Sequence, residues 1–361
     1  MVYTLYFALL ILGAIVARGR SGSSQYLMII MIALLIIIGF RDISVGTDTL
    51  SYTKDFAYFA QMSFSEIWDY AMESKEPLYV LVSWLPSIFS SNYTLYLFTW
   101  ALFPIFSLYN VFKEELNDSK DILVAMIVFF LLGLFAFYVA GIRQTAALSI
   151  VFWGAKFLRR FSWKGLFRLL LDKNIYAFFL MITVAYMIHN SAILFILAIP
   201  CLFFKVRWWY LLGILGLFFL GSYVKIDQIV LLSELFFDDR FASYGTVYES
   251  SQNTSALIMQ LILFSICFLV RGKLVDRDSN NNFFFNMMFI GLVLQSLSGM
   301  LAEMSRISFY FIMFAMILVP RAFEEYPRRI QHLAYVGFMI VGIFYLFFLT
   351  GSNLPRYHSI F

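Results

Sequence analysis

Residues 25–40 read QYLMIIMIALLIIIGF, an apolar run without a charged side chain that ends directly before Arg41 and Asp42. A run of this length and composition is typical of a helix that crosses a lipid bilayer. Similar runs recur along all 361 residues, of which 62% are hydrophobic and only 13% are charged. Soluble domains carry about 25% charged residues. The composition therefore excludes a soluble fold and makes lipid the solvent for most of the surface.

The apolar runs predict an all-α polytopic membrane protein with about twelve transmembrane helices in one transmembrane domain over residues 1–361. A further apolar run at 78–90 is shorter than a span and contains Pro86. We expect it to form a re-entrant or interfacial helix. The expected spans lie near residues 2–17, 25–40, 93–112, 122–140, 144–158, 174–189, 191–204, 208–224, 256–270, 283–301, 306–320 and 330–350.

The distribution of Lys and Arg predicts the orientation of these spans. If residues 78–90 do not cross the bilayer, most of the 26 Lys and Arg residues fall in links on one side. The positive-inside rule places that side in the cytoplasm. Both chain ends then face outward, as do two longer loops, a first outer loop at 41–92 and a second at 225–255.

Ionisable side chains at membrane depth are costly, so each one marks a site or a partner. Arg41 follows the second span and precedes a turn at Gly46, whose backbone N–H groups are candidates for an anion site. A helix cap with a snorkelling arginine is the structural alternative. Arg143 lies between two apolar helices at the outer boundary, where a planar guanidinium matches phosphate oxygens. Its structural alternative is an ion pair with a carboxylate.

Further polar groups fall on the same side. His189 separates two apolar helices, where the alternative is a packing histidine. Glu303, Arg306 and Tyr310 share one helical face, for which an intrahelical ion pair is the alternative. Residues 41–76 interleave acidic with aromatic side chains, a composition typical of sugar binding. An amphipathic helix at 56–72 that lies on the bilayer is compatible with that interpretation.

Five short motifs in a fixed order carry a resemblance to a known family. They are GFRDISVGTDTLSY at 39–52, EPLY at 76–79, GIRQTA at 141–146, HNSA at 189–192 and PRY at 355–357. In this order and spacing the chain resembles the EpsG-type branch of the Wzy polysaccharide polymerases. The resemblance implies a GT-C-like membrane glycosyltransferase of the bacterial cytoplasmic membrane. Such an enzyme joins oligosaccharide repeat units, carried on undecaprenyl pyrophosphate, into exopolysaccharide, capsule or O-antigen at the outer face.

The resemblance also implies roles for individual residues. Pyrophosphate is expected at Arg41, Arg143, Arg306 and the backbone of Gly46. The general base is expected among His189, Asp48, Glu76 and Glu303, of which a histidine is the most suitable near neutral pH. Substrate contacts are expected at Tyr52, Gln144, Tyr310 and Tyr357. We expect no metal or other cofactor because arginines supply the counter-charge, and we expect inversion as the outcome of a single displacement.

The expected partners are the lipid-linked oligosaccharide donor and acceptor, membrane lipid and a chain-length-regulating co-polymerase. The net charge of +4 is too small for a nucleic-acid footprint. An O-antigen ligase-like transferase is an alternative because it uses the same donor. A transporter or flippase for the lipid-linked oligosaccharide is the alternative outside enzymes, and internal repeats with charges accessible from both sides would indicate it. The candidate charges here gather on one side instead.

Overall fold

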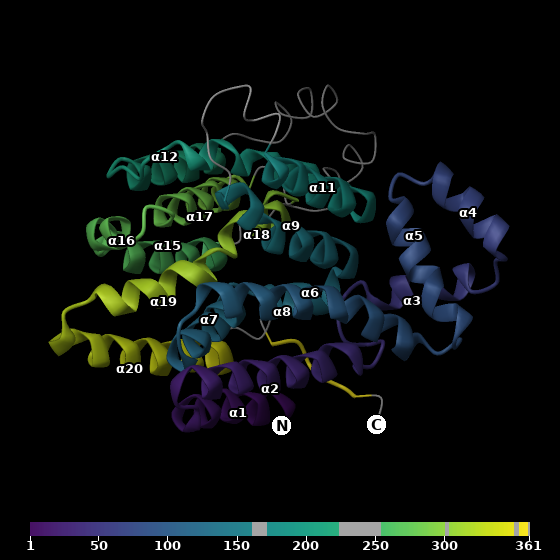
Figure 1. Cartoon of the computed structure of the whole chain (residues 1–361), viewed down its shortest axis with the longest axis horizontal. Coiled ribbons are helices and arrows are strands. Elements are labelled where there is room, and N and C mark those ends of the chain that lie inside the picture. Colours follow the sequence, from purple (N-terminus) through teal and green to yellow (C-terminus); the bar gives the residue numbers. More distant parts are fainter. Residues whose placement is uncertain (161–171, 224–253, 300–302, 350–353, 360–361) are drawn as a thin grey trace.

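The computed structural model of the protein describes residues 1–160, 172–223, 254–299, 303–349 and 354–359. Within these ranges the chain is helical and contains no β-strand, apart from one isolated bridge between Arg41 and Ser359. The longer helices lie side by side, and α3, α4 and α5 form a group at one end of them (Figure 1). Both chain ends lie near α1 and α2.

The regular elements begin and end as follows. The α-helices are α1 (Val2–Val16), α2 (Gly19–Gly39), α3 (Thr49–Phe59), α4 (Phe64–Glu73), α5 (Pro77–Trp84), α6 (Tyr93–Glu115), α7 (Ser119–Leu131), α8 (Leu134–Ala140), α9 (Ile142–Arg160), α11 (Lys173–Ile188), α12 (Tyr210–Tyr223), α15 (Thr254–Leu269), α16 (Arg271–Arg277), α17 (Asn281–Ser296), α18 (Glu303–Ile312), α19 (Ala315–Glu325) and α20 (Arg328–Phe344). Three short 3-10 helices are η1 (Leu85–Ile88), η2 (Asn190–Ala198) and η3 (Pro200–Leu202), and a π-helical turn, η5 (Tyr345–Leu349), continues α20.

Three helices are long and apolar enough to cross a bilayer, namely α2, α6 and the continuous helix Arg328–Phe348. The number rises to six if each of three bent pairs forms one span. These pairs are α7–α8, α15–α16 and α18–α19, bent by 62°, 66° and 49°. By length and composition, the described residues therefore support a polytopic membrane protein with three to six spans, fewer than the twelve that the apolar runs predict.

Two expected spans are not single α-helices in the structure, and packing explains the break in the first of them. The run 122–140 is not one helix, because Gly133 adopts φ 74° between α7 and α8 and breaks it. The run 191–204 forms the short 3-10 helices η2 and η3 in place of a long α-helix. Every residue of α7 except Lys120 is buried. Irregular backbone is tolerated at membrane depth where protein, and not lipid, surrounds it.

The segment between α2 and α6 does not form a long helix. The run 78–90 corresponds to α5 and η1, which are shorter than a span. The amphipathic helix expected at 56–72 is split, because Ser63 and Glu66 form a capping box that starts α4 anew. Of the expected second outer loop at 225–255, residues 225–253 lie outside the described residues.

One end of the bundle is joined by ion pairs between links that charge counting places on the same side. Glu115, at the end of α6, pairs with Arg159 of α9 and Arg321 of α19. Arg321 also reaches Asp278, before α17, at 3.4 Å. Arg277 of α16 pairs with Glu324 and Glu325 of α19. The helix group α3–α5 lies at the opposite end (Figure 1).

At the end near α3, the buried side chain of Arg41 joins three chain segments. It is 0% exposed. Its Nη1 donates to the carbonyl of Ile38 in α2 at 2.5 Å, and its Nη2 donates to Val139 in α8 at 3.0 Å. Its Nε donates to Val45 in the following turn at 3.4 Å. These contacts favour the helix-capping alternative for Arg41 over contact with phosphate.

The turn after Arg41 packs against the same carbonyl. Gly46 has φ +95°, and a Cβ atom there would lie 2.3 Å from the Val139 oxygen, so only glycine fits. The N–H groups of Ser44, Val45 and Thr49 bond within the turn, to Asp42 and Gly46. The turn at Gly46 is therefore packed closely against α8, and binding of an anion by its backbone stays a prediction.

We expect Arg41→Lys to destabilise the fold, because the guanidinium reaches its three carbonyls from three separate nitrogens and the donors of an ammonium all leave one nitrogen. A buried carbonyl left without a donor costs about 1–3 kcal/mol. The loss falls chiefly on Ile38, since the Thr49 hydroxyl also bonds the carbonyls of Val45 and Val139. The variant should unfold at a lower temperature in detergent, as measured by loss of the monodisperse size-exclusion peak after heating. Arg20→Lys, at an exposed position, is the control and should behave as the wild type. Wild-type stability of Arg41→Lys would contradict the capping role.

Candidate functional site

The carboxylate of Glu76 joins residues from two other chain segments. Its Oε2 accepts a hydrogen bond from Nη1 of Arg143 at 2.8 Å. Its Oε1 lies 2.8 Å from Nδ1 of His189 and accepts the backbone N–H of Asn190 at 3.3 Å. The side chain of Glu76 is 12% exposed, whereas those of Arg143 and His189 are 36% and 25% exposed. The carboxylate is thus covered, while Arg143 and His189 remain accessible.

Local sequence explains why these groups stand at helix ends. Glu76 precedes α5, and Pro77 occupies the first helical position, where its fixed φ suits a helix start. Arg143 lies in the first turn of α9, directly after α8 ends at Gly141. His189 caps the end of α11, and η2 begins with the next residue. The polar side chains at these three helix breaks therefore meet at the same end of the bundle.

Two tyrosine rings lie close to the guanidinium of Arg143. Its Cζ lies 5.4 Å from the ring centre of Tyr52 in α3 and 4.8 Å from that of Tyr79 in α5. The hydroxyl of Tyr79 donates to Oδ2 of Asp55 at 2.9 Å. Both distances to the rings are in the range of cation–π contacts. Tyr79 and Asp55 were not among the predicted site residues, although Tyr79 closes the EPLY motif.

A second set of polar groups lies next to the ion pair. Gln144 follows Arg143, and its Nε2 lies 3.4 Å from Oγ of Ser191 and 3.5 Å from the carbonyl of Arg306. The Ser191 hydroxyl lies 3.1 Å from the hydroxyl of Tyr310. These contacts bring α9, η2 and α18 together. They also place two hydroxyl groups and one amide beside the Glu76 cluster.

The groups around Glu76 lower the pKa of its carboxyl. Burial raises the pKa of the Glu76 carboxyl, but the hydrogen bond and charge of His189, the charge of Arg143 and the Asn190 N–H outweigh it. The pKa of Glu76 is therefore below its ordinary value.

Two further charged residues lie close enough to Tyr52 to affect its pKa. Burial raises the pKa of its phenol, Arg143 and Arg306 act to lower it, and Asp48 acts to raise it. Asp48 and Arg306 are thus electrostatic neighbours of the Arg143 site. Arg306 is exposed, and within the described part of the chain it forms no ion pair.

Most of the predicted site residues meet at this end of the bundle. They come from five separate segments and are Asp48, Tyr52, Glu76, Arg143, Gln144, His189, Arg306 and Tyr310. Glu303 begins α18, half-buried, and no ion pair joins it to Arg306 among the described residues. Whether Glu303 acts in the site stays a prediction.

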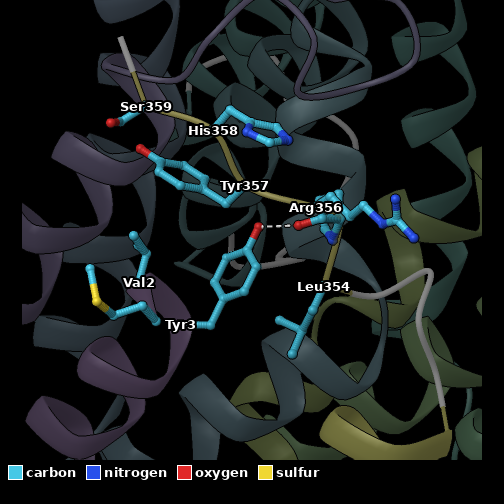
Figure 2. A pocket seen from close by; sticks show the side chains of 9 residues that line it. Val2, Tyr3, Leu354, Arg356, Tyr357, His358 and Ser359 are labelled. Atoms are coloured by element: carbon cyan, nitrogen blue, oxygen red, sulfur yellow. Dashed lines mark hydrogen bonds between the residues drawn. The ribbon is translucent and has the colours of Figure 1, made fainter. Parts of the chain in front are cut away.

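Tyr357 lies elsewhere. Its hydroxyl donates to the carbonyl of Ile37 at 3.1 Å, and its ring lies 6.0 Å from that of Tyr3. Figure 2 shows both rings in a pocket of about 520 Å³ between the chain's first residues and residues 354–359. The tail is held there by the Tyr3 hydroxyl, which donates to the Pro355 carbonyl at 2.6 Å. Substrate contact at Tyr357 therefore finds no support in its position.

The described residues contain no group of three or more His, Cys, Asp or Glu side chains arranged to hold a metal ion. In the site, the Glu76 carboxylate is bonded to the His189 imidazole and to the backbone N–H of Asn190.

Comparison with known proteins gives one match. Residues 25–360 match the model of the EpsG family, which covers all of the residues described above except the start of the chain. No curated protein and no solved structure matches the chain.

We expect acid to destabilise the wild type more than Glu76→Gln. Since the folded-state pKa of Glu76 lies below its ordinary value of 4.5, the ionised carboxylate stabilises the fold above that pH. This contribution is lost as the pH falls through the lowered pKa. The midpoint temperature, measured in detergent from about pH 7 to about pH 3, should fall more steeply for the wild type. Asp69→Asn, at an exposed position of α4, is the control with wild-type behaviour. Parallel curves for the wild type and Glu76→Gln would remove this carboxylate from the acid response.

Proposed function

Because the chain belongs to the EpsG family, which is of the exopolysaccharide and O-antigen polymerase type, we propose that it polymerises undecaprenyl-pyrophosphate-linked oligosaccharide repeat units. The reaction would take place at the outer face of the bacterial cytoplasmic membrane. The observation that carries the proposal is the Glu76 carboxylate, which holds Arg143 on one oxygen and His189 on the other. This arrangement supplies a base and a cation for the same transfer.

The proposed reaction is a single displacement at the anomeric carbon. A hydroxyl oxygen of one lipid-linked unit forms a bond to the anomeric carbon of the reducing-end sugar on the other. The bond from that carbon to the pyrophosphate oxygen breaks, and the lipid pyrophosphate leaves with the electron pair. The hydroxyl proton passes to a base in the site. One displacement inverts the configuration at that carbon.

His189 is the base that the geometry supports best. An ionised carboxylate only accepts hydrogen bonds, so the contact between Glu76 Oε1 and His189 Nδ1 requires a proton on Nδ1. In the neutral imidazole the other ring nitrogen, Nε2, carries no proton and is able to take that of the acceptor hydroxyl. Glu76 would orient the imidazole and stabilise the imidazolium that forms, as the carboxylate of a catalytic triad does. Asp48 and Glu303 are the remaining candidates for the base.

Arg143 and Arg306 would stabilise the leaving pyrophosphate. Arg143 uses one nitrogen for Glu76 and retains a partly exposed guanidinium, and Arg306 is exposed on α18. Positive groups placed where charge develops lower the barrier without a proton transfer. We infer that these arginines supply the counter-charge without a metal ion. Gln144, Tyr52 and Tyr310, with Ser191, would contact the sugars.

The proposal includes a twelve-span, GT-C-like topology with the site facing outward. Its support is that the Glu115 ion pairs and the Glu76 cluster lie at opposite ends of the bundle. The Glu115 ion pairs join links that are rich in Lys and Arg, and the positive-inside rule assigns such links to the cytoplasm. A chain-length-regulating co-polymerase would be a further partner. A transporter would carry its charges where both sides reach them. The described polar cluster is instead built at one end of the bundle, which favours catalysis at an interface.

The deciding experiment incubates the purified protein with undecaprenyl-pyrophosphate-linked repeat units and separates the products by gel. We expect a ladder of products. We expect Arg143→Ala to give no ladder and to leave single lipid-linked repeats, because the leaving group loses its counter-charge. Transfer of one unit to a different acceptor would indicate a ligase. If the folded wild type leaves the glycan unchanged, the proposal that the protein is an enzyme is wrong.

His189→Gln tests the base. The glutamine amide can still donate to Glu76, but it takes no proton from the acceptor, so the initial rate should fall about a hundredfold or more. The midpoint temperature in detergent should stay close to that of the wild type. A rate near that of the wild type would exclude His189 as the base and move the role to Asp48 or Glu303.

A further inference from the structure

We propose that Tyr79 and Asp55 are positioning residues that hold the Arg143 guanidinium in the orientation in which it meets the pyrophosphate of the substrate. The proposal rests on the proposed function and adds two residues to the site. Neither residue is assigned a role by the reaction described above. Both lie between α2 and α6, in the helix group at one end of the bundle (Figure 1).

The first observation is the fixed position of the Tyr79 ring. Tyr79 is only 4% exposed. Its ring centre lies 5.7 Å from that of Trp100 in α6, 6.2 Å from Phe59 and 6.3 Å from Tyr52, both in α3. Its hydroxyl is held by Asp55 at 2.9 Å. A ring packed by aromatic neighbours and bonded at its far end has little freedom to turn.

The second observation is that Cζ of Arg143 lies within cation–π distance of two rings, 4.8 Å from the centre of Tyr79 and 5.4 Å from that of Tyr52. One nitrogen of Arg143 is already bonded to Glu76. The guanidinium is therefore restricted by two rings and one carboxylate, and its remaining accessible edge points in a fixed direction. A group that is ordered before binding loses less conformational entropy when it binds phosphate. Arginine suits such a site because its planar cation stacks on rings, which a lysine ammonium does not do equally well.

The third observation is that a single face of α3 supports both rings. Tyr52, Asp55, Phe56 and Phe59 follow the spacing of one helical face. Tyr52 contacts Arg143 directly, and Asp55 reaches it through Tyr79. The start of α3 is in turn fixed to α8 by the Thr49 hydroxyl, which lies 2.7 Å from the Val45 carbonyl and 3.2 Å from that of Val139. The same junction that places α9 thus also places the residues that orient its arginine.

The test uses Tyr79→Phe and Asp55→Asn in the full-length protein. Tyr79→Phe keeps the ring over Arg143 and removes the hydrogen bond to Asp55. Asp55→Asn keeps an acceptor for the tyrosine and removes the charge. We expect Tyr79→Phe to raise the KM for the lipid-linked donor, and the Kd for inorganic pyrophosphate, about 3- to 10-fold. We expect a smaller change in the same direction for Asp55→Asn. Tyr58→Phe, on the exposed face of α3, is the matched control and should leave both constants unchanged.

A double-mutant cycle shows whether these residues act through Arg143. In an Arg143→Lys background, Tyr79→Phe should have no further effect on pyrophosphate binding, because the group that it positions is absent. An equal loss in both backgrounds would overturn the proposal, as would wild-type constants for both Tyr79→Phe and Asp55→Asn. A purely structural role would lower the midpoint temperature and leave pyrophosphate binding by the folded fraction unchanged, which would also overturn it.

Failure of the proposed function is a separate result. If the wild type forms no polymer, while its pyrophosphate affinity still depends on Tyr79 and Asp55 through Arg143, the positioning role stands and the polymerase reaction does not. If the wild type forms polymer and the two variants match it in KM and in pyrophosphate affinity, the polymerase reaction stands and the positioning role does not.

Discussion

The buried guanidinium of Arg41 is the interaction on which the arrangement of the site depends. It bonds carbonyls of α2, of the following turn and of α8, three segments that no other single side chain among the described residues joins. A charge buried in a membrane protein persists only where hydrogen bonds compensate for its lost hydration. Val139, one of its acceptors, lies just before the turn into α9. The position of Arg143 therefore follows from the same contacts that close the end of α8.

Each end of the bundle contains a glutamate paired with arginine, but the two ion pairs differ in exposure. At one end Glu115, 9% exposed, is held by Arg159 and Arg321, which are 14% and 17% exposed. At the other end Glu76 is equally covered, but Arg143 and His189 are 36% and 25% exposed. The more deeply buried ion pairs of Glu115 join α6, α9 and α19. An ion pair with one open side is able to exchange partners with an anionic ligand, and for this reason we propose the Glu76 end as the site.

The ion-pair and phosphate interpretations of Arg143 are compatible. The carboxylate of Glu76 occupies one nitrogen of the guanidinium and keeps the side chain in place before substrate arrives. The lowered pKa of Glu76 keeps that carboxylate ionised across the neutral range. The same carboxylate bonds His189, so a single acidic residue sets the orientation of a cation and of an imidazole. Family membership supplies the reaction type, and this geometry supplies the groups that would carry it out.

The sequence by itself determined the helical, membrane-embedded class, the family and the segments that form the site. Composition sets the solvent, and a polar residue at each break between apolar helices has to lie at a helix end, which is why Glu76, Arg143 and His189 were found. Only the tertiary structure decided that Arg41 caps helices, because its acceptors are backbone carbonyls, which leave no mark in the sequence. The contact of Tyr79 with Asp55 and the break of α7–α8 at Gly133 also needed the fold. Which side chains meet across separate helices depends on packing, and packing is set by shape rather than by the apolar period of any one segment.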